Sequence, residues 1–82
     1  MEISFSRHAL SQLEARNIAK QAVIDAVKSP DKIFSQSVRR SQAIKRIEKL
    51  GKSYLLAVIF DEINFHQQIV TAFITAKIKK YL

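Results

Sequence analysis

The sequence predicts an α+β protein in which one mainly antiparallel sheet carries two N-terminal helices on one face, in the order β-α-α-β-β-β-β. Two segments in the first third of the chain have apolar residues at helical spacing, and two long apolar, β-branched stretches follow in its last third. The chain has 82 residues, a length that suits one domain over residues 1–82 with a small hydrophobic core.

The N-terminal segment is expected to form a short strand followed by two helices. Residues 2–6 alternate apolar and polar side chains, as a half-buried strand does. Ser6 is a suitable N-cap for a helix over residues 7–16, and Asn17 can end that helix in the left-handed conformation. A second helix is expected over residues 19–28, and a Ser-Pro-Asp sequence stops it.

Strands are expected in the rest of the chain. Residues 31–36 fit a short edge strand, residues 54–60 an apolar central strand, and residues 68–76 a second buried central strand. Residues 61–66 are expected to form the turn before the last strand. Residues 41–50 fit either a helical stripe or an amphipathic strand; we favour the strand, because its short Gly-containing connection to the next strand resembles a hairpin. The sheet face opposite the helices, or the rim of that face, is expected to be left to solvent and partners.

Composition excludes several kinds of chemistry. The chain has no cysteine, which excludes thiol nucleophiles, zinc knuckles and disulfides, and its one glycine excludes a Gly-rich phosphate loop. Its two histidines have no metal-ligand spacing with acidic residues, so we expect neither a metal nor a cofactor. No stretch is long and apolar enough to span a bilayer and no signal segment is present, which predicts a cytoplasmic protein without a membrane partner.

Positive charge is concentrated in the middle of the chain and at its end. The net charge is +7, and residues 28–52 hold eight Lys or Arg against two acidic residues. Three further lysines follow the last predicted strand. If the two segments lie side by side, they form a basic face of the kind that binds phosphates. The candidates for nucleic-acid contacts are Arg39, Arg40, Lys45, Lys49, Lys52 and Lys79.

The side chains available for catalysis are those of Arg, Lys, Tyr and His, because the acidic residues are scattered. This set suits cleavage of RNA, in which the substrate supplies a 2′-hydroxyl nucleophile and cationic side chains neutralise the charge that develops on the phosphate. The same basic residues also fit a solvated edge strand, where lysines discourage aggregation.

Four patterns along the chain carry a family resemblance. They read Ser6-x-His8-Ala9, Arg16-x-Ile18, Tyr54-Leu55-Leu56-x-Val58 and Val70-Thr71-x-x-x-Thr75-x-Lys77-Ile78-x-Lys80-Tyr81. Together they resemble a small bacterial family of domains of unknown function related to the BrnT and RelE/ParE toxins. The resemblance implies a RelE-like fold and a type II toxin-antitoxin toxin. Such a toxin is an endoribonuclease that cleaves mRNA, free or bound to the ribosome, and that a cognate antitoxin protein inhibits.

The resemblance also implies roles for individual residues. In RelE-type enzymes the catalytic work falls to Arg, Lys and Tyr side chains on the sheet and the C-terminal tail. The matching residues here are Arg46, Lys77, Lys80 and Tyr81. His8 is a further catalytic candidate; its alternative is a partly buried helix residue that bonds a backbone carbonyl. Arg16 is expected to cap the carbonyls at the end of the first helix or to pair with an acid such as Glu2, with phosphate binding as the alternative role.

Two other functions remain open from the sequence. Ala57 stands in the predicted central strand where similar sequences often place an arginine, and Ala76 stands where they place a hydroxyl residue. The chain could therefore be a non-catalytic module that binds nucleic acid or an acidic antitoxin through the same basic surface. It could also be a homo-oligomeric structural subunit whose charge serves solubility.

Overall fold

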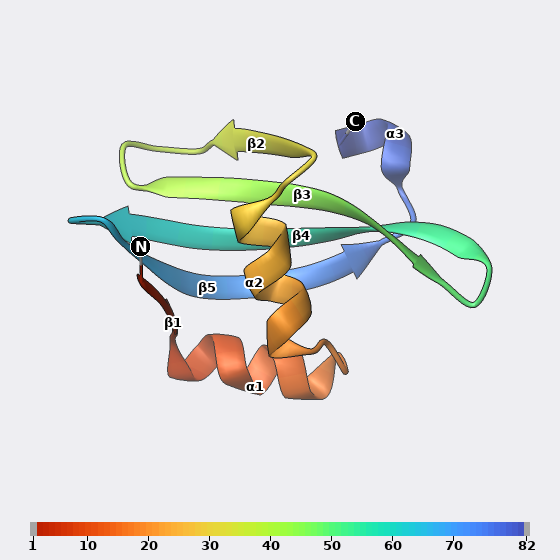
Figure 1. The fold of residues 1–82 in the computed structure, drawn as a ribbon, viewed down its shortest axis with the longest axis horizontal. Coiled ribbons are helices and arrows are strands. Elements are labelled where there is room, and N and C mark those ends of the chain that lie inside the picture. Colours follow the sequence, from red (N-terminus) through yellow and green to blue (C-terminus); the bar gives the residue numbers. More distant parts are fainter. Residues whose placement is uncertain (1, 82) are drawn as a thin grey trace.

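Residues 2–81 are described by the computed structural model, in which helices and strands are arranged around one sheet (Figure 1). The order of elements is β-α-α-β-β-β-β, followed by a short C-terminal helix. The bounds are β1 Glu2–Phe5, α1 Arg7–Ala15, α2 Lys20–Lys28, β2 Lys32–Ser35, β3 Arg40–Lys49, β4 Lys52–Ile63, β5 His66–Thr75 and α3 Ile78–Tyr81.

The strands of residues 2–81 form one five-stranded mixed sheet in the order β1-β5-β4-β3-β2. β1 pairs with β5 in parallel, and the other neighbouring strands pair antiparallel. Figure 1 shows α2 crossing the sheet and α1 lying beside β5, and both helices pack on the same face. The predicted α+β class, with one sheet and a pair of helices, is therefore confirmed.

The two helices form close to where the sequence predicts them. Ser6 is the N-cap of α1, and its Oγ accepts a hydrogen bond from the backbone N–H of Ala9 at 3.0 Å. Asn17 follows α1 with φ 54°, the left-handed conformation that ends a helix. Each helix buries one apolar stripe against the sheet. The buried residues are Ala9 and Leu13 in α1 and Val23, Ala26 and Val27 in α2.

The segment that fitted either a helix or a strand forms strand β3. Its successive side chains point to opposite faces of the sheet. Ala43 joins the core beneath the helices, and Ile44 joins a second hydrophobic cluster on the other face. β3 pairs with β4 along its length through a hairpin that turns at Leu50 and Gly51, which both have positive φ. The prediction of a strand here is confirmed.

β4 and β5 are longer than predicted, and the turn between them is shorter. β4 continues to Ile63 and β5 begins at His66, so the longer predicted turn is wrong. The polar residues before the turn extend the strand because they have partners on β3 and on the residue just before it. Asp61 forms an ion pair with that strand, and the Glu62 N–H donates to the carbonyl of Arg39 at 2.8 Å.

β5 is a central strand over only part of its length. β1 covers its outer edge as far as Ile69, and the rest of that edge lies next to α1. Arg16 closes part of this edge: its Nη1 donates to the backbone carbonyl of Ala72 at 2.7 Å and lies 3.4 Å from Thr71 Oγ1. Arg16 is the C-cap of α1, as expected, and its backbone N–H donates to the carbonyl of Gln12 at 2.9 Å. The expectation that its side chain pairs with an acid is wrong, because a strand carbonyl beyond the end of β1 takes the guanidinium instead.

The C-terminal lysines lie around a helical turn and not on an extended tail. α3 packs on the sheet face opposite α1 and α2, where Ile78 and Tyr81 contact a cluster of fully buried side chains. This cluster consists of Ile44, Leu55 and Ala57. The expectation that the whole face is left to solvent is therefore wrong, because its centre holds a small hydrophobic core. The alternative expectation concerned only the rim of the face.

The turn between β4 and β5 holds an exposed aromatic residue in a strained conformation. Asn64 and Phe65 have φ values of 49° and 64°, as in the type I′ turns of two-residue hairpins. Glycine is preferred at the second position, because a left-handed backbone costs other residues about 1–2 kcal/mol. The Phe65 residue is 86% exposed, so burial of its ring does not offset that cost.

Replacing Phe65 with glycine is therefore expected to stabilise the protein by about 0.5–1 kcal/mol, after allowing for the greater freedom of glycine in the unfolded chain. Thermal unfolding should show an increase in Tm of about 2–8 °C. Phe65→Ala is the matched control, because it removes the ring but keeps the strained backbone, and its Tm should stay near the parent value. A lower Tm for Phe65→Gly would contradict this account of the turn.

Candidate functional site

The candidate site lies on the face of the sheet opposite α1 and α2, which we call the open face. Alternation along β3 places Arg46 on this face, two residues beyond the buried Ile44. Arg46 is exposed; its register partner in β4 is Leu55, which in turn pairs with Thr75 at the end of β5. The Arg46 backbone N–H donates to Asp31 Oδ2 at 2.6 Å, so the strand is anchored beside the guanidinium.

β5 and α3 bring the C-terminal candidates to the same part of the open face. The chain turns after Thr75, whose Oγ1 accepts a hydrogen bond from the Lys77 N–H at 3.1 Å. The Tyr81 ring then packs edge-on against Phe73, with ring centroids 6.4 Å apart and planes at 60°. Lys80 Nζ lies 5.7 Å from the centroid of the Tyr81 ring, within range of a cation–π interaction.

Arg46 lies beside the hydrophobic cluster against which Tyr81 packs. Tyr81 packs against the cluster that contains Leu55, and Leu55 is the register partner of Arg46. The structure therefore places Arg46 and Tyr81 beside the same cluster, with Lys80 at the Tyr81 ring. Lys77 is exposed between β5 and α3. Such an arrangement can bind a phosphate group and place a phenol hydroxyl near it.

Two further residues at the edge of the open face were not predicted. Lys32 and Phe34 lie in β2, and their register partners in β3 are Ile44 and Gln42. Lys32 Nζ lies 5.0 Å from the centroid of the Phe34 ring. Alternation in β2 is a sequence signal that points both side chains to one face. That face could not be connected with Arg46 without knowing that β2 lies beside β3.

Arg40 is engaged in an ion pair at the far end of the open face. Its Nε and Nη2 donate to the two carboxylate oxygens of Asp61 at 2.8 and 3.0 Å. The hydrogen bond from Arg40 lowers the pKa of Asp61, and the same bond raises the pKa of Arg40. Both groups stay charged and compensate each other. Arg39 next to them is exposed.

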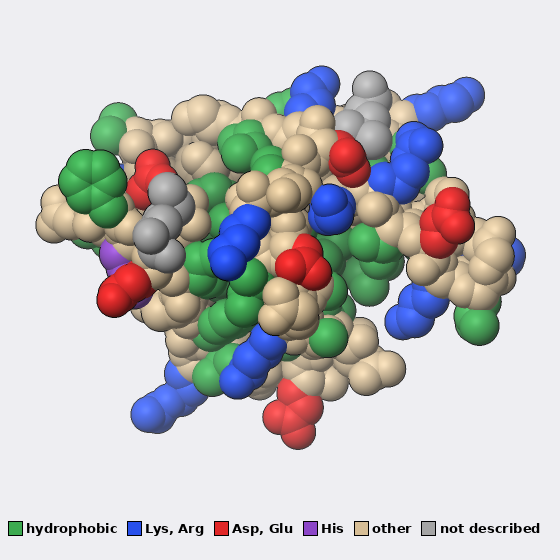
Figure 2. Space-filling view, in the orientation of Figure 1, with side chains coloured by type: hydrophobic (Ala, Val, Ile, Leu, Met, Phe, Trp, Pro, Cys, Tyr) green, Lys and Arg blue, Asp and Glu red, His purple; other side chains and the backbone are tan. Residues whose placement is uncertain are grey.

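The other predicted nucleic-acid contacts are divided between the two sides of the sheet. Lys45 lies on the helix side, where its Nζ donates to the carbonyl of Ser29 at 2.8 Å, directly after α2. Lys49 and Lys52 are register partners at the end of the β3–β4 hairpin. Lys79 is exposed on α3. Figure 2 shows the helix-bearing side, on which Lys and Arg side chains are interspersed with Asp and Glu.

His8 lies apart from the cluster on the open face. It is exposed in the first turn of α1, on the helix side of the sheet. The structure does not bring it together with Arg46 or Tyr81. Its interpretation as a partly buried helix residue is also wrong, because the buried stripe of α1 runs through Ala9 and Leu13.

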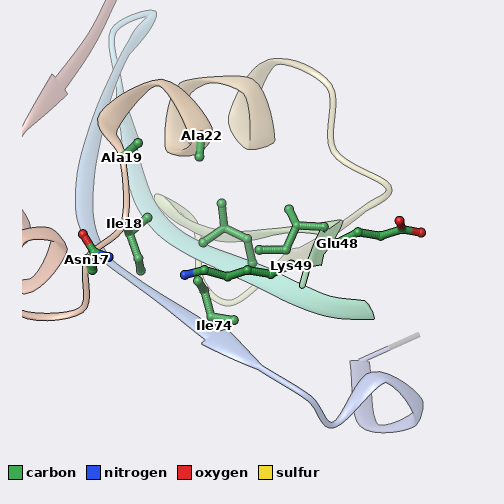
Figure 3. A pocket seen from close by; sticks show the side chains of 9 residues that line it. Asn17, Ile18, Ala19, Ala22, Glu48, Lys49 and Ile74 are labelled. Atoms are coloured by element: carbon green, nitrogen blue, oxygen red, sulfur yellow. The ribbon is translucent and has the colours of Figure 1, made fainter. Parts of the chain in front are cut away.

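A hollow of about 250 Å³ lies on the helix side, between the α1–α2 turn and the β3–β4 hairpin. Figure 3 shows Ile18 and Ile74 at its walls, Lys49 extending across it and Glu48 pointing away. Hydrophobic side chains are visible in this part of the surface in Figure 2. With mainly apolar walls, the hollow offers few groups for catalysis, and the open face remains the candidate site.

A serine and a histidine that the sequence did not connect are also close together. Ser4 Oγ and His66 Nε2 lie 2.6 Å apart, between β1 and β5. Glu2 Oε2 is 3.6 Å from the other ring nitrogen, which is too far for a hydrogen bond, and the Glu2 side chain is 89% exposed. Because Glu2 does not fix the imidazole, this pair lacks the orienting contact of a serine nucleophile; it fastens β1 to β5.

Two kinds of feature were not found in residues 2–81. No group of three or more His, Cys, Asp or Glu side chains in this range could hold a metal ion. No helix in the same range has the length and apolar character needed to cross a membrane.

The fold and the site define a small α+β protein whose open face combines cations with packed aromatic rings. The chain belongs to the family described as "Domain of unknown function (DUF4258)", whose model matches residues 5–74. The matched range includes Arg46, whereas Lys77, Lys80 and Tyr81 follow it. No curated protein and no solved structure matches the chain. The comparisons therefore identify the family, and the relation to BrnT and RelE/ParE toxins is a matter for proposal.

Proposed function

We propose that this protein is a RelE-like type II toxin that cleaves mRNA without a metal ion. The observation that supports this best is that Arg46 lies beside the hydrophobic cluster against which Tyr81 packs, with Lys80 at the Tyr81 ring, although Arg46 is far from the other two in the sequence. β3 holds the first, and the packing of α3 holds the other two, so regular elements fix their positions. A cytoplasmic location belongs to the same proposal.

In the proposed reaction, the 2′-oxygen of the RNA attacks the adjacent phosphorus. The bond from phosphorus to the 5′-oxygen of the next nucleotide breaks, which leaves a 2′,3′-cyclic phosphate and a 5′-hydroxyl. The proton of the 2′-hydroxyl passes to a solvent water molecule, and the 5′-oxygen gains a proton from a group that solvent then reprotonates. Arg46 neutralises the non-bridging phosphate oxygens, with added charge from Lys77 and Lys80. The Tyr81 hydroxyl passes a proton to the leaving oxygen.

The partners in this proposal are mRNA, free or bound to the ribosome, and a cognate antitoxin protein. An antitoxin that blocks the reaction has to cover the open face. The cationic side chains of Arg46 and α3 favour an acidic segment for that role, because complementary charge speeds association and excludes other partners.

A non-catalytic binding module of the same fold is the second candidate. The fully buried Ala57 favours it, because the centre of the open face offers an apolar side chain where a cation would contact a phosphate. Such a module would bind single-stranded RNA with an affinity that falls with salt, at a log–log slope of about −0.7 for each phosphate neutralised. Binding that is insensitive to salt would argue against this candidate.

The nuclease proposal is tested with purified protein, a labelled mRNA fragment and a metal chelator, with and without ribosomes. Fragments with 5′-hydroxyl ends are expected in at least one condition. Tyr81→Phe should slow cleavage strongly but keep the ring contact with Phe73 and the fold. Lys28→Gln removes an exposed cation from the end of α2 and serves as the control, with cleavage unchanged. Intact RNA in both conditions would show that the enzymatic proposal is wrong.

A further inference from the structure

The open face carries a second aromatic position at its β2 edge, apart from the proposed cleavage site. Phe34 is half-buried against the Ile44 cluster, and β2 is the last strand of the sheet. Lys32 Nζ lies 5.0 Å from the centroid of its ring. This ring face is covered by a flexible lysine side chain and not by the core, so a flat group can take the place of the ammonium.

A fixed amide lies next to this ring. Gln42 is the register partner of Phe34 in β3 and lies on the same face. The Gln42 residue is only 9% exposed, and its Oε1 accepts a hydrogen bond from Gln36 Nε2 at 3.3 Å. This bond occupies the carbonyl end of the amide and restrains the side chain. The NH₂ end can donate to an acceptor atom of a ligand.

An accessible aromatic ring beside a restrained amide is suited to an unpaired nucleobase. The base stacks on the ring, and the amide donates to an acceptor on the base edge. Lys32 has a flexible side chain, so its ammonium can leave the ring and contact a phosphate of the same strand. Arg46 and the lysines of α3 supply further positive charge to that backbone.

The distance along β3 is compatible with one continuous RNA strand. Gln42 and Arg46 share a face and are four residues apart, which corresponds to about 13 Å at a rise of about 3.3 Å per residue. Stacked nucleotides rise by about 3.4 Å each. A base at Phe34 would therefore be no more than about four stacked nucleotides from a phosphate at Arg46.

We propose that Phe34 and Gln42 form a subsite for one unpaired nucleobase, a few nucleotides from the phosphate bound by Arg46. This inference rests on the proposed function, because it takes single-stranded RNA as the ligand. The subsite would make RNA binding depend on the identity of one base, because contacts to phosphates alone carry no sequence information.

The test measures the binding of a short single-stranded RNA in which every 2′-hydroxyl is methylated, so that 2′-attack cannot occur. A matched series of RNAs each lacks one base. The parent protein should bind one member of the series about 5- to 150-fold more weakly than the intact RNA, the usual range for loss of one stacked base.

Phe34→Leu keeps an apolar side chain on the Ile44 cluster but removes the stacking surface. It should bind the intact RNA more weakly by a similar factor and should no longer distinguish the RNA that lacks the critical base. Phe34→Tyr keeps the ring and should bind like the parent. Gln42→Glu replaces the amide donor with an acceptor and should weaken only the binding of RNA that carries the base. Phe65→Gly removes an exposed aromatic residue outside the subsite and should leave binding unchanged.

The inference would be overturned if Phe34→Leu bound the intact RNA as tightly as the parent does. It would also be overturned if Phe34→Leu weakened the binding of the RNA that lacks the critical base by the same factor as the binding of the intact RNA. The result can be separated from that of the cleavage assay. Cleavage by the parent together with parent-like binding by Phe34→Leu would overturn the subsite alone. Base-dependent binding without cleavage would support the subsite and contradict the nuclease. A parent protein that binds none of the RNAs would overturn the subsite.

Discussion

Replacing Ile69 with alanine is expected to lower the free energy of unfolding by about 2–5 kcal/mol. Ile69 is fully buried at the point where β1, β4 and β5 meet, with Phe5 and Phe60 as its register partners. Truncation removes its apolar contacts and leaves a cavity that the close-packed surroundings fill only in part. A protein of this length has a total stability of about 4–12 kcal/mol, so a large share would be lost. Urea unfolding followed by circular dichroism measures the change.

Ile33→Ala is the matched control, because it is the same substitution in the same sheet. Ile33 is 52% exposed in the edge strand β2, so its truncation should change stability by about 0.5 kcal/mol or less. If Ile69→Ala and Ile33→Ala cost the same, the position of the core beneath the helices would be wrong.

Arg46→Gln is expected to slow RNA cleavage by about 10²–10³-fold, if the proposed function is correct. The substitution removes the charge that would neutralise the phosphate as the 2′-oxygen attacks. It should leave the fold intact, because the hydrogen bond to Asp31 comes from the Arg46 backbone and the side chain is exposed. Single-turnover cleavage at saturating protein measures the chemical step apart from binding.

Arg39→Gln is the control for this substitution, since it also removes an exposed arginine, here near the far end of the sheet and beyond the proposed cleavage site. Its single-turnover rate at saturating protein should equal that of the parent. Parent-like cleavage by Arg46→Gln, with unchanged thermal stability, would remove Arg46 from the proposed mechanism.

The sequence predicts the elements whose signals are local. Ser6 caps its helix through its own side chain, and alternation identifies the strands, because each follows from the nearest few residues. α3 was not predicted because so short a helix depends on tertiary packing. Ile78 and Tyr81 of this helix pack against residues of β3 and β4, which are distant in the sequence. The true length of β4 was missed because Asp61 extends a strand only when Arg40 lies opposite.

The candidate site depended even more on tertiary structure. Charge counting identified Arg46 and the C-terminal lysines as residue types suited to phosphate, but their meeting requires that β4 lie between β3 and β5. The same counting grouped Lys45 with Arg46, although alternation sends these neighbours to opposite faces of the sheet. The number of charges along a strand therefore predicts the class of ligand, but it does not predict which cations share one face of the sheet.

The parallel pairing of β1 with β5 has a kinetic consequence. It brings together Ser4 and His66, which are 62 residues apart in the chain, whereas β2 to β5 pair with their neighbours in sequence. Closing a long loop costs entropy before its contacts form, so we expect the hairpins to form first and β1 to dock late. Substitutions in β1 should then accelerate unfolding more than they slow folding. The pairing of β1 with β5, and not the formation of the hairpins between β2 and β5, would then be the last step of folding.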